Sequence, residues 1–217
     1  MPSSSVDVRE LPLFPLPEVV LFPGRPLPLH IFEYRYRMMI NTILETDRRF
    51  GVLMFNPQTG SPVRVGCCAE VLQVQRLPDD RMDILTLGQQ RFRVLDYVRE
   101  KPFRVGLVEW IEDEPTTPSD DLQSWVRQVT TLLQDVVRLS GKLMERDAQL
   151  PEQLPTTPIE LSYWVASHFH GAPQEQQALL EMVSTERRLR REAEILESTR
   201  KHLAARTALK DLFTEIS

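Results

Sequence analysis

The fold of this chain is decided by a proline-rich stretch near the N-terminus. It reads Leu11-Pro-Leu-Phe-Pro-Leu-Pro-Glu-Val-Val-Leu-Phe-Pro-Gly24 and continues as Arg25-Pro-Leu-Pro-Leu-His-Ile-Phe-Glu-Tyr-Arg-Tyr-Arg37. Its prolines, at positions 12, 15, 17, 23, 26 and 28, exclude a helix and remove six backbone donors. We therefore expect short extended pieces, for example at residues 19–22, and no long central strand through the stretch.

The residues that follow predict a β-rich domain with one helix. After Glu33 the prolines stop, and apolar residues recur at helical spacing, which predicts a helix at about residues 34–45. Short apolar or alternating runs at residues 50–55, 65–77, 82–94 and 103–110 are typical of strands, with turn residues between them. The pattern alone therefore predicts β structure that carries a single helix.

Further motifs recur along both halves of the chain: Leu11-Pro-Leu-Phe-Pro-Leu, Val20-Leu-Phe-Pro-Gly, Leu27-Pro-Leu-His-Ile-Phe-Glu, Val65-Gly-Cys-Cys-Ala-Glu-Val, Gly88-Gln-Gln-Arg-Phe-Arg-Val, Leu161-Ser-Tyr-Trp-Val-Ala and Glu186-Arg-Arg-Leu. Together these motifs resemble the N-terminal domain of the Lon protease family, including its stand-alone members and the related part of cereblon. The resemblance covers nearly the whole chain. It implies a PUA-like, mostly antiparallel β-barrel and a substrate-engaging role.

The second half of the chain predicts a helical bundle. A polar, proline-bearing segment at residues 114–120 is the predicted linker, and an apolar stripe from Leu122 to Leu143 predicts a long helix after it. Thr157, Pro158 and Glu160 form a capping box, Pro173 opens a further helix, and Ser184 caps a last helix of about 45 Å. We predict an α+β protein with a tail at residues 1–8, a barrel at 9–113 and a bundle at 121–217.

Composition and charge exclude several classes of function. Residues 9–113 carry 14 Lys and Arg against 14 Asp and Glu, so DNA is not expected as a partner, and RNA is disfavoured. No apolar run approaches the roughly 20 residues of a membrane helix, so we expect no membrane partner. Residues 1–7 do not form a secretory signal, and the two cysteines are adjacent, so we expect a cytoplasmic protein.

The sequence carries no recognisable catalytic or metal-binding motif. It contains neither a P-loop nor a Gly-x-Ser-x-Gly nucleophile motif, and the ATPase and Ser–Lys protease modules of full-length Lon lie outside the matched domain. His168 and His170 are two positions apart, which points them to different faces of a helix. We expect no cofactor, no metal site and no enzymatic activity, and we interpret Cys67 and Cys68 as small apolar residues.

The predicted site is a set of aromatic and arginine side chains: Phe32, Tyr34, Arg35, Arg91 and Phe92. With Arg37 and Arg93, the two arginines of this set would form a cluster if the helix at residues 34–45 lies on the strand that contains Arg91. Such a cluster would form the rim of a binding pocket, or it would be structural, with pairing to a buried carboxylate, for example Glu33, and packing of the arginine stems. We expect binding in a groove between barrel and helices, because proline blocks the pairing of another strand with the proline-rich stretch itself.

The main hypothesis is therefore a non-catalytic module that binds unfolded or regulated polypeptides and passes them to a protease or adaptor on another chain. Two alternatives stay open. One is RNA binding through the PUA-like barrel, and the other is an enzyme that acts in the groove between barrel and helices.

Overall fold

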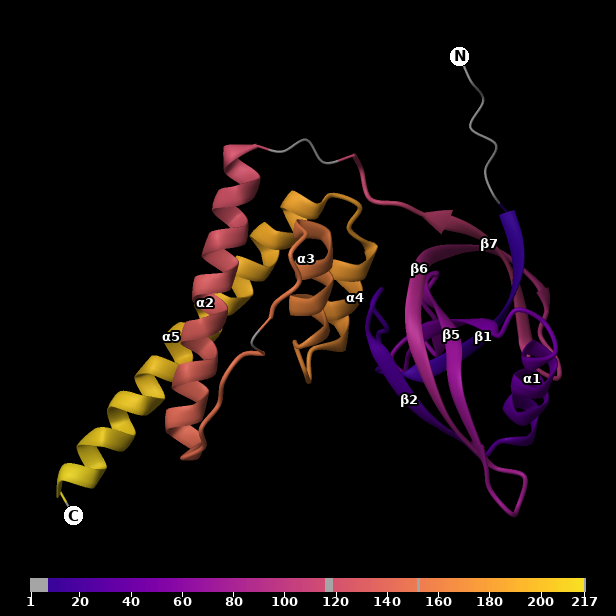
Figure 1. Ribbon diagram of the computed structural model, residues 1–217, viewed down its shortest axis with the longest axis horizontal. Coiled ribbons are helices and arrows are strands. Elements are labelled where there is room, and N and C mark those ends of the chain that lie inside the picture. The colour runs from indigo at the N-terminus through magenta and orange to yellow at the C-terminus, as the bar shows by residue number, and fades with distance from the viewer. Residues whose placement is uncertain (1–7, 116–118, 152, 217) are drawn as a thin grey trace. The chain divides into compact units, whose positions relative to one another are not determined.

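The computed structural model describes residues 8–115, 119–151 and 153–216, with side chains up to Lys210 (Figure 1). The predicted tail at residues 1–7 and positions 116–118 of the predicted linker lie outside the described residues. Contacts divide the chain into two compact units. One comprises the chain up to Glu112 together with Ala166–Val183, and the other comprises Asp113–Val165 and Ser184–Ser217.

The first unit is built on a closed, mostly antiparallel ring of strands. The strands are β1 (Val8–Pro17), β2 (Pro26–Ile31), β3 (Arg49–Asn56), β4 (Ser61–Pro62), β5 (Val65–Arg76), β6 (Met82–Arg99) and β7 (Arg104–Ile111). Their order is β1-β7-β6-β5-β3-β4, and a parallel pairing of β1 with β3 closes the ring. Strand β2 pairs with β6 outside this path. The prediction of a mostly antiparallel barrel with one helix, followed by a helical region, is confirmed.

The prediction of short extended pieces in the proline-rich stretch, for example at residues 19–22, was wrong. Strand β1 spans ten residues and contains three of the prolines, whereas residues 19–22 form no strand. Residues 8–13 of β1 pair with β7, and residues 13–17 pair with β3. Each half of β1 has one neighbouring strand, so only every second N–H of that half donates to a neighbour. A proline at one of the other positions, which face the open edge, therefore removes no hydrogen bond from the sheet.

The alternation of β1 shows which prolines face the open edge. The N–H of Glu18 donates to the carbonyl of Phe55 on β3, so even-numbered positions at this end of β1 face β3. Pro15 and Pro17 therefore face the opposite edge, which β7 leaves uncovered. The same alternation holds in β2. The carbonyl of Arg25 accepts from the N–H of Gly88 on β6, so odd-numbered positions face β6 and Pro26 and Pro28 face the outer edge.

Helix α1 (Tyr34–Leu44) packs on the ring through one apolar face, as its spacing predicts. Tyr36, Met39, Ile40 and Ile43 are buried in a cluster with residues of β1, β2, β3, β5, β6 and β7. A second cluster surrounds Phe92; it consists of Leu11, Leu13, Leu53, Cys68, Phe92, Val94 and Val108. Two hydrophobic clusters therefore hold the first unit, and the buried face of α1 belongs to the first of them.

The helices of the second unit begin where the sequence predicts. They are α2 (Asp120–Met144), α3 (Pro158–Ser167, in this unit up to Val165) and α5 (Thr185–Ile216). At α3 the Thr157 hydroxyl accepts from the N–H of Glu160, as in a capping box, but the Glu160 carboxylate accepts from that hydroxyl and not from the backbone N–H of Thr157. At α5, Ser184 Oγ accepts from the N–H of Arg187 at 3.4 Å. Among the described residues, no helix is long and apolar enough to cross a membrane.

Helix α4 (Pro173–Glu181) belongs to the first unit, although it lies far along the sequence. Gln177 Nε2 donates to the carbonyl of Val65 on β5 at 3.0 Å, which attaches the helix to the ring of strands. Sequence spacing had placed this segment in the helical bundle at residues 121–217. Whether 9–113 and 121–217 behave as separate domains in solution remains a prediction.

Candidate functional site

The first unit contains a groove of about 1140 Å³ along the end of β1. Residues of β1, β2, the start of α1, the end of β3 and the segment 100–104 line it. Five aromatic side chains are shared among these elements: Phe14, Phe32, Tyr36, Phe55 and Phe103. A largely apolar cavity of this size with a few polar groups at its rim is the usual form of a ligand site.

The base of the groove consists of buried aromatic rings that pack on one another. The rings of Phe14 and Tyr36 lie 4.0 Å apart between centroids, and Phe14 also packs on Phe50 at 6.1 Å. Phe14, Tyr36 and Phe103 are almost fully buried, and burial raises the pKa of the Tyr36 hydroxyl. In contrast, 61% of Phe32 is exposed, so its ring offers apolar surface at the mouth of the groove. The buried rings need no ordering on binding, which lowers the entropic cost of association.

The rim of the groove carries both signs of charge. Arg35 donates to Glu33 at 2.8 Å, and its guanidinium lies 4.5 Å from the centroid of the Tyr36 ring. Glu100, Lys101 and Arg104 also line the groove, from the segment at residues 100–104. The groove therefore has no strong field of one sign, and an apolar ligand fits it better than a polyanion.

The main chain of β1 offers this groove acceptors without donors. Pro15 and Pro17 both line the groove and face the edge that β7 leaves open. Their carbonyls can accept hydrogen bonds, but the pyrrolidine rings leave no N–H to donate. An added strand could not complete a ladder here, so recognition falls to side chains.

Three of the five predicted site residues lie on the surface near this groove. Phe32 and Arg35 line it directly. Tyr34 is 69% exposed beside them at the start of α1, and the Arg37 guanidinium lies 5.7 Å from its ring centroid. The structure thus brings together Phe32, Tyr34 and Arg35.

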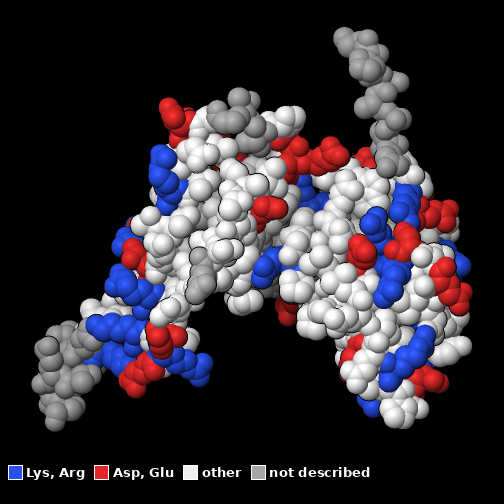
Figure 2. Space-filling view, in the orientation of Figure 1, with Lys and Arg blue, Asp and Glu red and all other residues white. Residues whose placement is uncertain are grey.

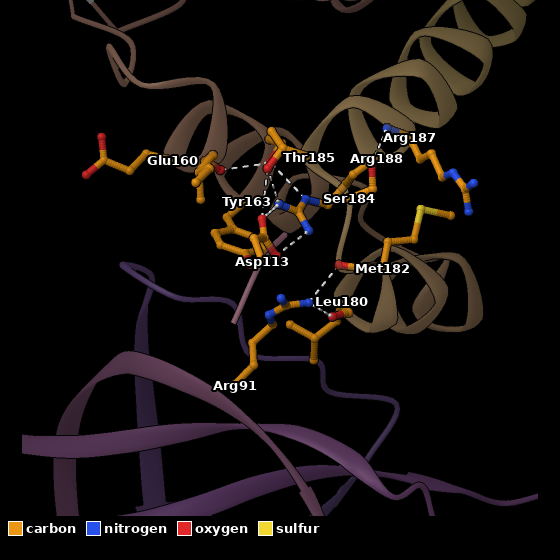
Figure 3. A network of polar contacts seen from close by, with 12 residues as sticks. Arg91, Asp113, Glu160, Tyr163, Leu180, Met182, Ser184, Thr185, Arg187 and Arg188 are labelled. Atoms are coloured by element: carbon orange, nitrogen blue, oxygen red, sulfur yellow. Dashed lines mark hydrogen bonds and ion pairs between the residues drawn. The ribbon is translucent and has the colours of Figure 1, made fainter. Parts of the chain in front are cut away.

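The other two, Arg91 and Phe92, lie in the interior of the first unit, with exposed fractions of 1% and 0%. Arg91 Nη1 donates to the carbonyls of Leu180 and Met182, each at 2.7 Å (Figure 3). The ring of Phe92 occupies the space that two glycines leave free, since a Cβ at Gly51 would stand 2.5 Å from it. Neither side chain is accessible to a ligand in this structure.

The four arginines considered for a cluster have separate surroundings. Arg37 Nη1 donates to the carbonyl of Asp79 at 3.2 Å, and Arg93 pairs with Glu109 at 3.1 Å. Arg35 pairs with Glu33, but the exposed fractions of the two side chains are 53% and 42%, so this is not the buried pairing of the structural alternative. No shared arginine rim is present among these four residues.

Sequence reasoning missed the aromatic base of the groove. Phe14, Tyr36, Phe55 and Phe103 come from four separate elements, and each is indistinguishable from an ordinary core residue in the sequence. Their convergence depends on the parallel pairing of β1 with β3, which places Pro17 opposite Phe55. The one available signal was the clustering of proline and aromatic residues in the first stretch.

The described residues offer little for metal or thiol chemistry. No group of three or more potential metal ligands occurs among them. Cys67 and Cys68 are free and buried, and burial raises the pKa of both thiols, that of Cys68 to about 11. A buried thiol that stays protonated is a poor nucleophile, which agrees with the apolar role inferred from the sequence.

Comparison with known proteins identifies the class. The family model "ATP-dependent protease La (LON) substrate-binding domain" matches residues 10–198. Similar full-length proteins include Lon protease of Syntrophus aciditrophicus, 25% identical over 189 residues, and Lon protease 2 of Myxococcus xanthus, 26% identical over 199 residues. These matches cover 83% and 89% of this chain but 24% of each relative, so the chain spans about a quarter of their length.

Solved structures agree on the fold. A Lon N-terminal domain protein from Xanthomonas campestris superposes with a TM-score of 0.62 at 24% identity, covering 84% of this chain and 95% of that one. The N-terminal domain of Mycobacterium avium complex Lon protease gives 0.64 at 16% identity, with coverages of 89% and 98%. The chain belongs to the Lon substrate-binding domain family.

Proposed function

We propose that this chain is a non-catalytic polypeptide-binding module, and that the aromatic groove of the first unit holds exposed apolar segments of its clients. The observation that carries the proposal is the groove itself, in which five aromatic side chains from separate elements meet. Membership of a substrate-binding family supports a polypeptide as the ligand class.

The groove suits an extended segment that is held by its side chains. Buried rings form the base, and the exposed ring of Phe32 provides apolar surface at the mouth. Because Pro15 and Pro17 offer no N–H, strand addition contributes little to the affinity. A side-chain mode tolerates many client sequences, as recognition of unfolded proteins requires.

The role that follows is that of an adaptor. The matched family model covers the substrate-binding part of Lon, and we propose that clients bound here pass to a protease on another chain. We also propose that the protein acts in the cytoplasm, where its free thiols at Cys67 and Cys68 remain reduced.

The test is a binding titration with labelled unfolded casein and labelled single-stranded RNA. We expect affinity for casein on the order of micromolar that changes little with salt, since apolar contacts dominate and ordering of the client opposes binding. Phe32→Ala and Tyr34→Ala should weaken it, and both sites are exposed, so folding is preserved. Val98→Ala, at an exposed apolar residue of β6 that does not line the groove, is the matched control.

Two outcomes would overturn this function. Tight RNA binding with a steep salt dependence, and no casein signal, would favour an RNA-binding barrel. ATP hydrolysis or casein cleavage that persists through purification, and is lost on a point mutation in the chain, would show an enzyme. Equal casein affinity in the Phe32 and Val98 variants would remove the groove from the proposal while leaving the module intact.

A further inference from the structure

The outer edge of β5 is an open strand edge without proline. Strand β3 covers β5 only at residues 67–70, whereas β6 pairs with β5 as far as Arg76. The chain that leads into β3 turns away from this edge at Arg48, where φ is 62°. Among the described residues, positions 72–76 therefore have a neighbouring strand on one side alone. The open edges of β1 and β2 carry prolines, but this one contains none.

The hydrogen bonds of the β5–β6 hairpin show which main-chain groups face the open edge. At the tip of the hairpin the N–H of Leu77 donates to the carbonyl of Arg81, so odd-numbered positions in this part of β5 face β6. Val74 and Arg76 therefore direct their N–H and C=O groups away from β6. No group among the described residues bonds to them at this edge. Because buried main-chain groups are almost always paired, these groups face solvent.

The ends of this edge carry two arginines whose charges are not paired. Arg48 Nε donates to the carbonyl of Val71 at 3.0 Å, and Arg76 Nη2 donates to Asn41 Oδ1 at 2.8 Å. Both acceptors are neutral, and within the described part of the chain neither arginine forms an ion pair. Between them Leu72, the extra residue of a β-bulge, is 46% exposed. The edge therefore combines free main-chain groups, an apolar side chain and positive charge.

We propose that residues 72–76 of β5 bind an extended, acidic segment of a client polypeptide by strand addition. The main chain of the client would pair with that of Val74 and Arg76. Two client carboxylates, about 17 Å apart along an extended chain, would lie near Arg48 and Arg76. The aromatic groove contacts client side chains, whereas this edge would bind the client main chain. The inference rests on the proposed function only for the class of ligand, a polypeptide.

Charge argues against two other occupants. In a two-fold pairing of β5 with a second copy, centred on Val74, Arg76 of one copy would lie beside Arg48 of the second copy. Like charges across a strand pair are destabilising, so these arginines oppose self-association. A polyanion is not favoured either, because the visible face of the first unit carries Lys and Arg interspersed with Asp and Glu (Figure 2). An extended acidic segment matches both the main chain and the charge of the edge.

The experiment uses the full chain and designed peptides. The probe is a fluorescent ten-residue peptide of alternating Val and Thr, with Glu at two positions that are five residues apart. Two further versions carry N-methyl groups on alternate residues between the Glu positions, one on the even and one on the odd residues. An added strand donates only every second N–H to its neighbour, so the two versions should differ in affinity. Binding is followed by fluorescence anisotropy at fixed salt.

Two substitutions at one position test the edge of the protein. Arg76→Pro removes an N–H that faces the open edge and no hydrogen bond to β6, whereas Arg76→Ala removes the same side chain and keeps the N–H. We expect Arg76→Pro to bind the probe about tenfold more weakly than Arg76→Ala. We also expect one methylated peptide to bind wild type about tenfold more weakly than the other. Thermal melts verify folding, and the methylated peptides decide the matter in wild type if Arg76→Pro does not fold.

Four results would overturn the proposal. The first is no binding of the probe, and the second is equal binding of the two methylated peptides. The third is equal binding by folded Arg76→Pro and Arg76→Ala. The fourth is a dimer of the free wild type that Arg76→Pro dissociates, which would assign the edge to a second copy.

Phe32→Ala separates this edge from the aromatic groove. It should change the affinity for the probe less than about twofold, although it should weaken casein binding. Loss of probe binding in Phe32→Ala alone would place the probe in the groove, which would refute strand addition and leave the proposed function intact. Unchanged casein binding in Phe32→Ala, with the expected results at Arg76, would refute the groove and leave the edge.

Discussion

Arg91 on β6 donates from one nitrogen to two carbonyls, those of Leu180 and Met182, each at 2.7 Å (Figure 3). These carbonyls lie at the end of α4, where a helix leaves its last acceptors unsatisfied and carries partial negative charge. A buried guanidinium is therefore stabilised by the helix terminus that it caps. The contact joins two segments of the first unit that lie about ninety positions apart in sequence.

Replacement of Arg91 should release α4. Arg91→Met keeps most of the side-chain volume but leaves two buried carbonyls without this donor, and we expect a loss of about 3 kcal/mol in local stability. Hydrogen exchange of the amides at residues 173–181 measures it. Arg91→Lys, which keeps the charge but loses the planar fork, should lose less. Unchanged protection of α4 in the Met variant would contradict this role.

The second unit depends on a buried ion pair between Arg188 and Asp113. Arg188 Nη2 lies 2.5 Å from Asp113 Oδ2, and the exposed fractions of the two side chains are 0% and 6%. Thr185 and Tyr163 also donate to the Asp113 carboxylate. Removal of one partner leaves the other charge buried, so Arg188→Met and Asp113→Asn should each cost about 3–5 kcal/mol.

A double-mutant cycle in urea distinguishes pairing from packing. If the contact is a coupled pair, the combined variant should cost much less than the sum of the two single variants. Additive losses would show that the two residues act independently. Arg190→Met, at an exposed position of the same helix, is the control and should change the free energy of unfolding by less than about 0.5 kcal/mol.

Glu192 should make the folded protein less stable as pH rises. It is fully buried on α5, neither carboxylate oxygen has a hydrogen-bond partner among the described residues, and desolvation raises its pKa well above 4.5, although Arg188 opposes the shift. Below the unfolded pKa both states are protonated. Above it the unfolded state releases the proton first, so stability falls by up to about 1.4 kcal/mol per pH unit until the folded pKa is reached.

Glu192→Gln should remove this dependence. The amide cannot ionise, so the variant should gain stability relative to the wild type as pH rises from 5 to 8. Urea unfolding at each pH gives the comparison. Glu194→Gln, on the exposed face of α5, should leave the slope unchanged. A wild-type slope equal to that of the Glu192 variant would contradict the raised pKa.

Local signals predicted the helices well. The spacing after Glu33 predicted α1, and Thr157, Pro173 and Ser184 predicted the starts of α3, α4 and α5. These features are decided by groups within a few residues of one another, such as a capping hydroxyl and the N–H three positions on. A single sequence therefore contains the information that is needed to predict where these helices begin.

Features that depend on distant partners were predicted less well. Arg91 and Phe92 were predicted as site residues on the assumption that the helix at residues 34–45 lies on the strand that contains Arg91. Their burial depends on α4 and on the space at Gly51, which lie far away in sequence. Phe55 joins the groove because of strand pairing with β1, and no local pattern indicates which strands will pair.

Pro15 and Pro17 give the last prediction, since they face the edge of β1 that β7 leaves open. An open edge with free N–H and C=O groups is a template for another strand, and proline removes half of that template. Pro15→Ala/Pro17→Ala restores two donors. The double variant should therefore self-associate at high concentration, as measured by sedimentation, whereas the wild type should not.

The same variant should bind unfolded polypeptide more tightly, because a client carbonyl would gain partners in the groove. The change should be a few-fold in affinity, since each hydrogen bond contributes about 1 kcal/mol net. Pro78→Ala, in the turn between β5 and β6, is the matched control for loss of a proline elsewhere in the unit. If the double variant and the control match the wild type in both sedimentation and client affinity, Pro15 and Pro17 do not prevent the addition of a strand at this edge.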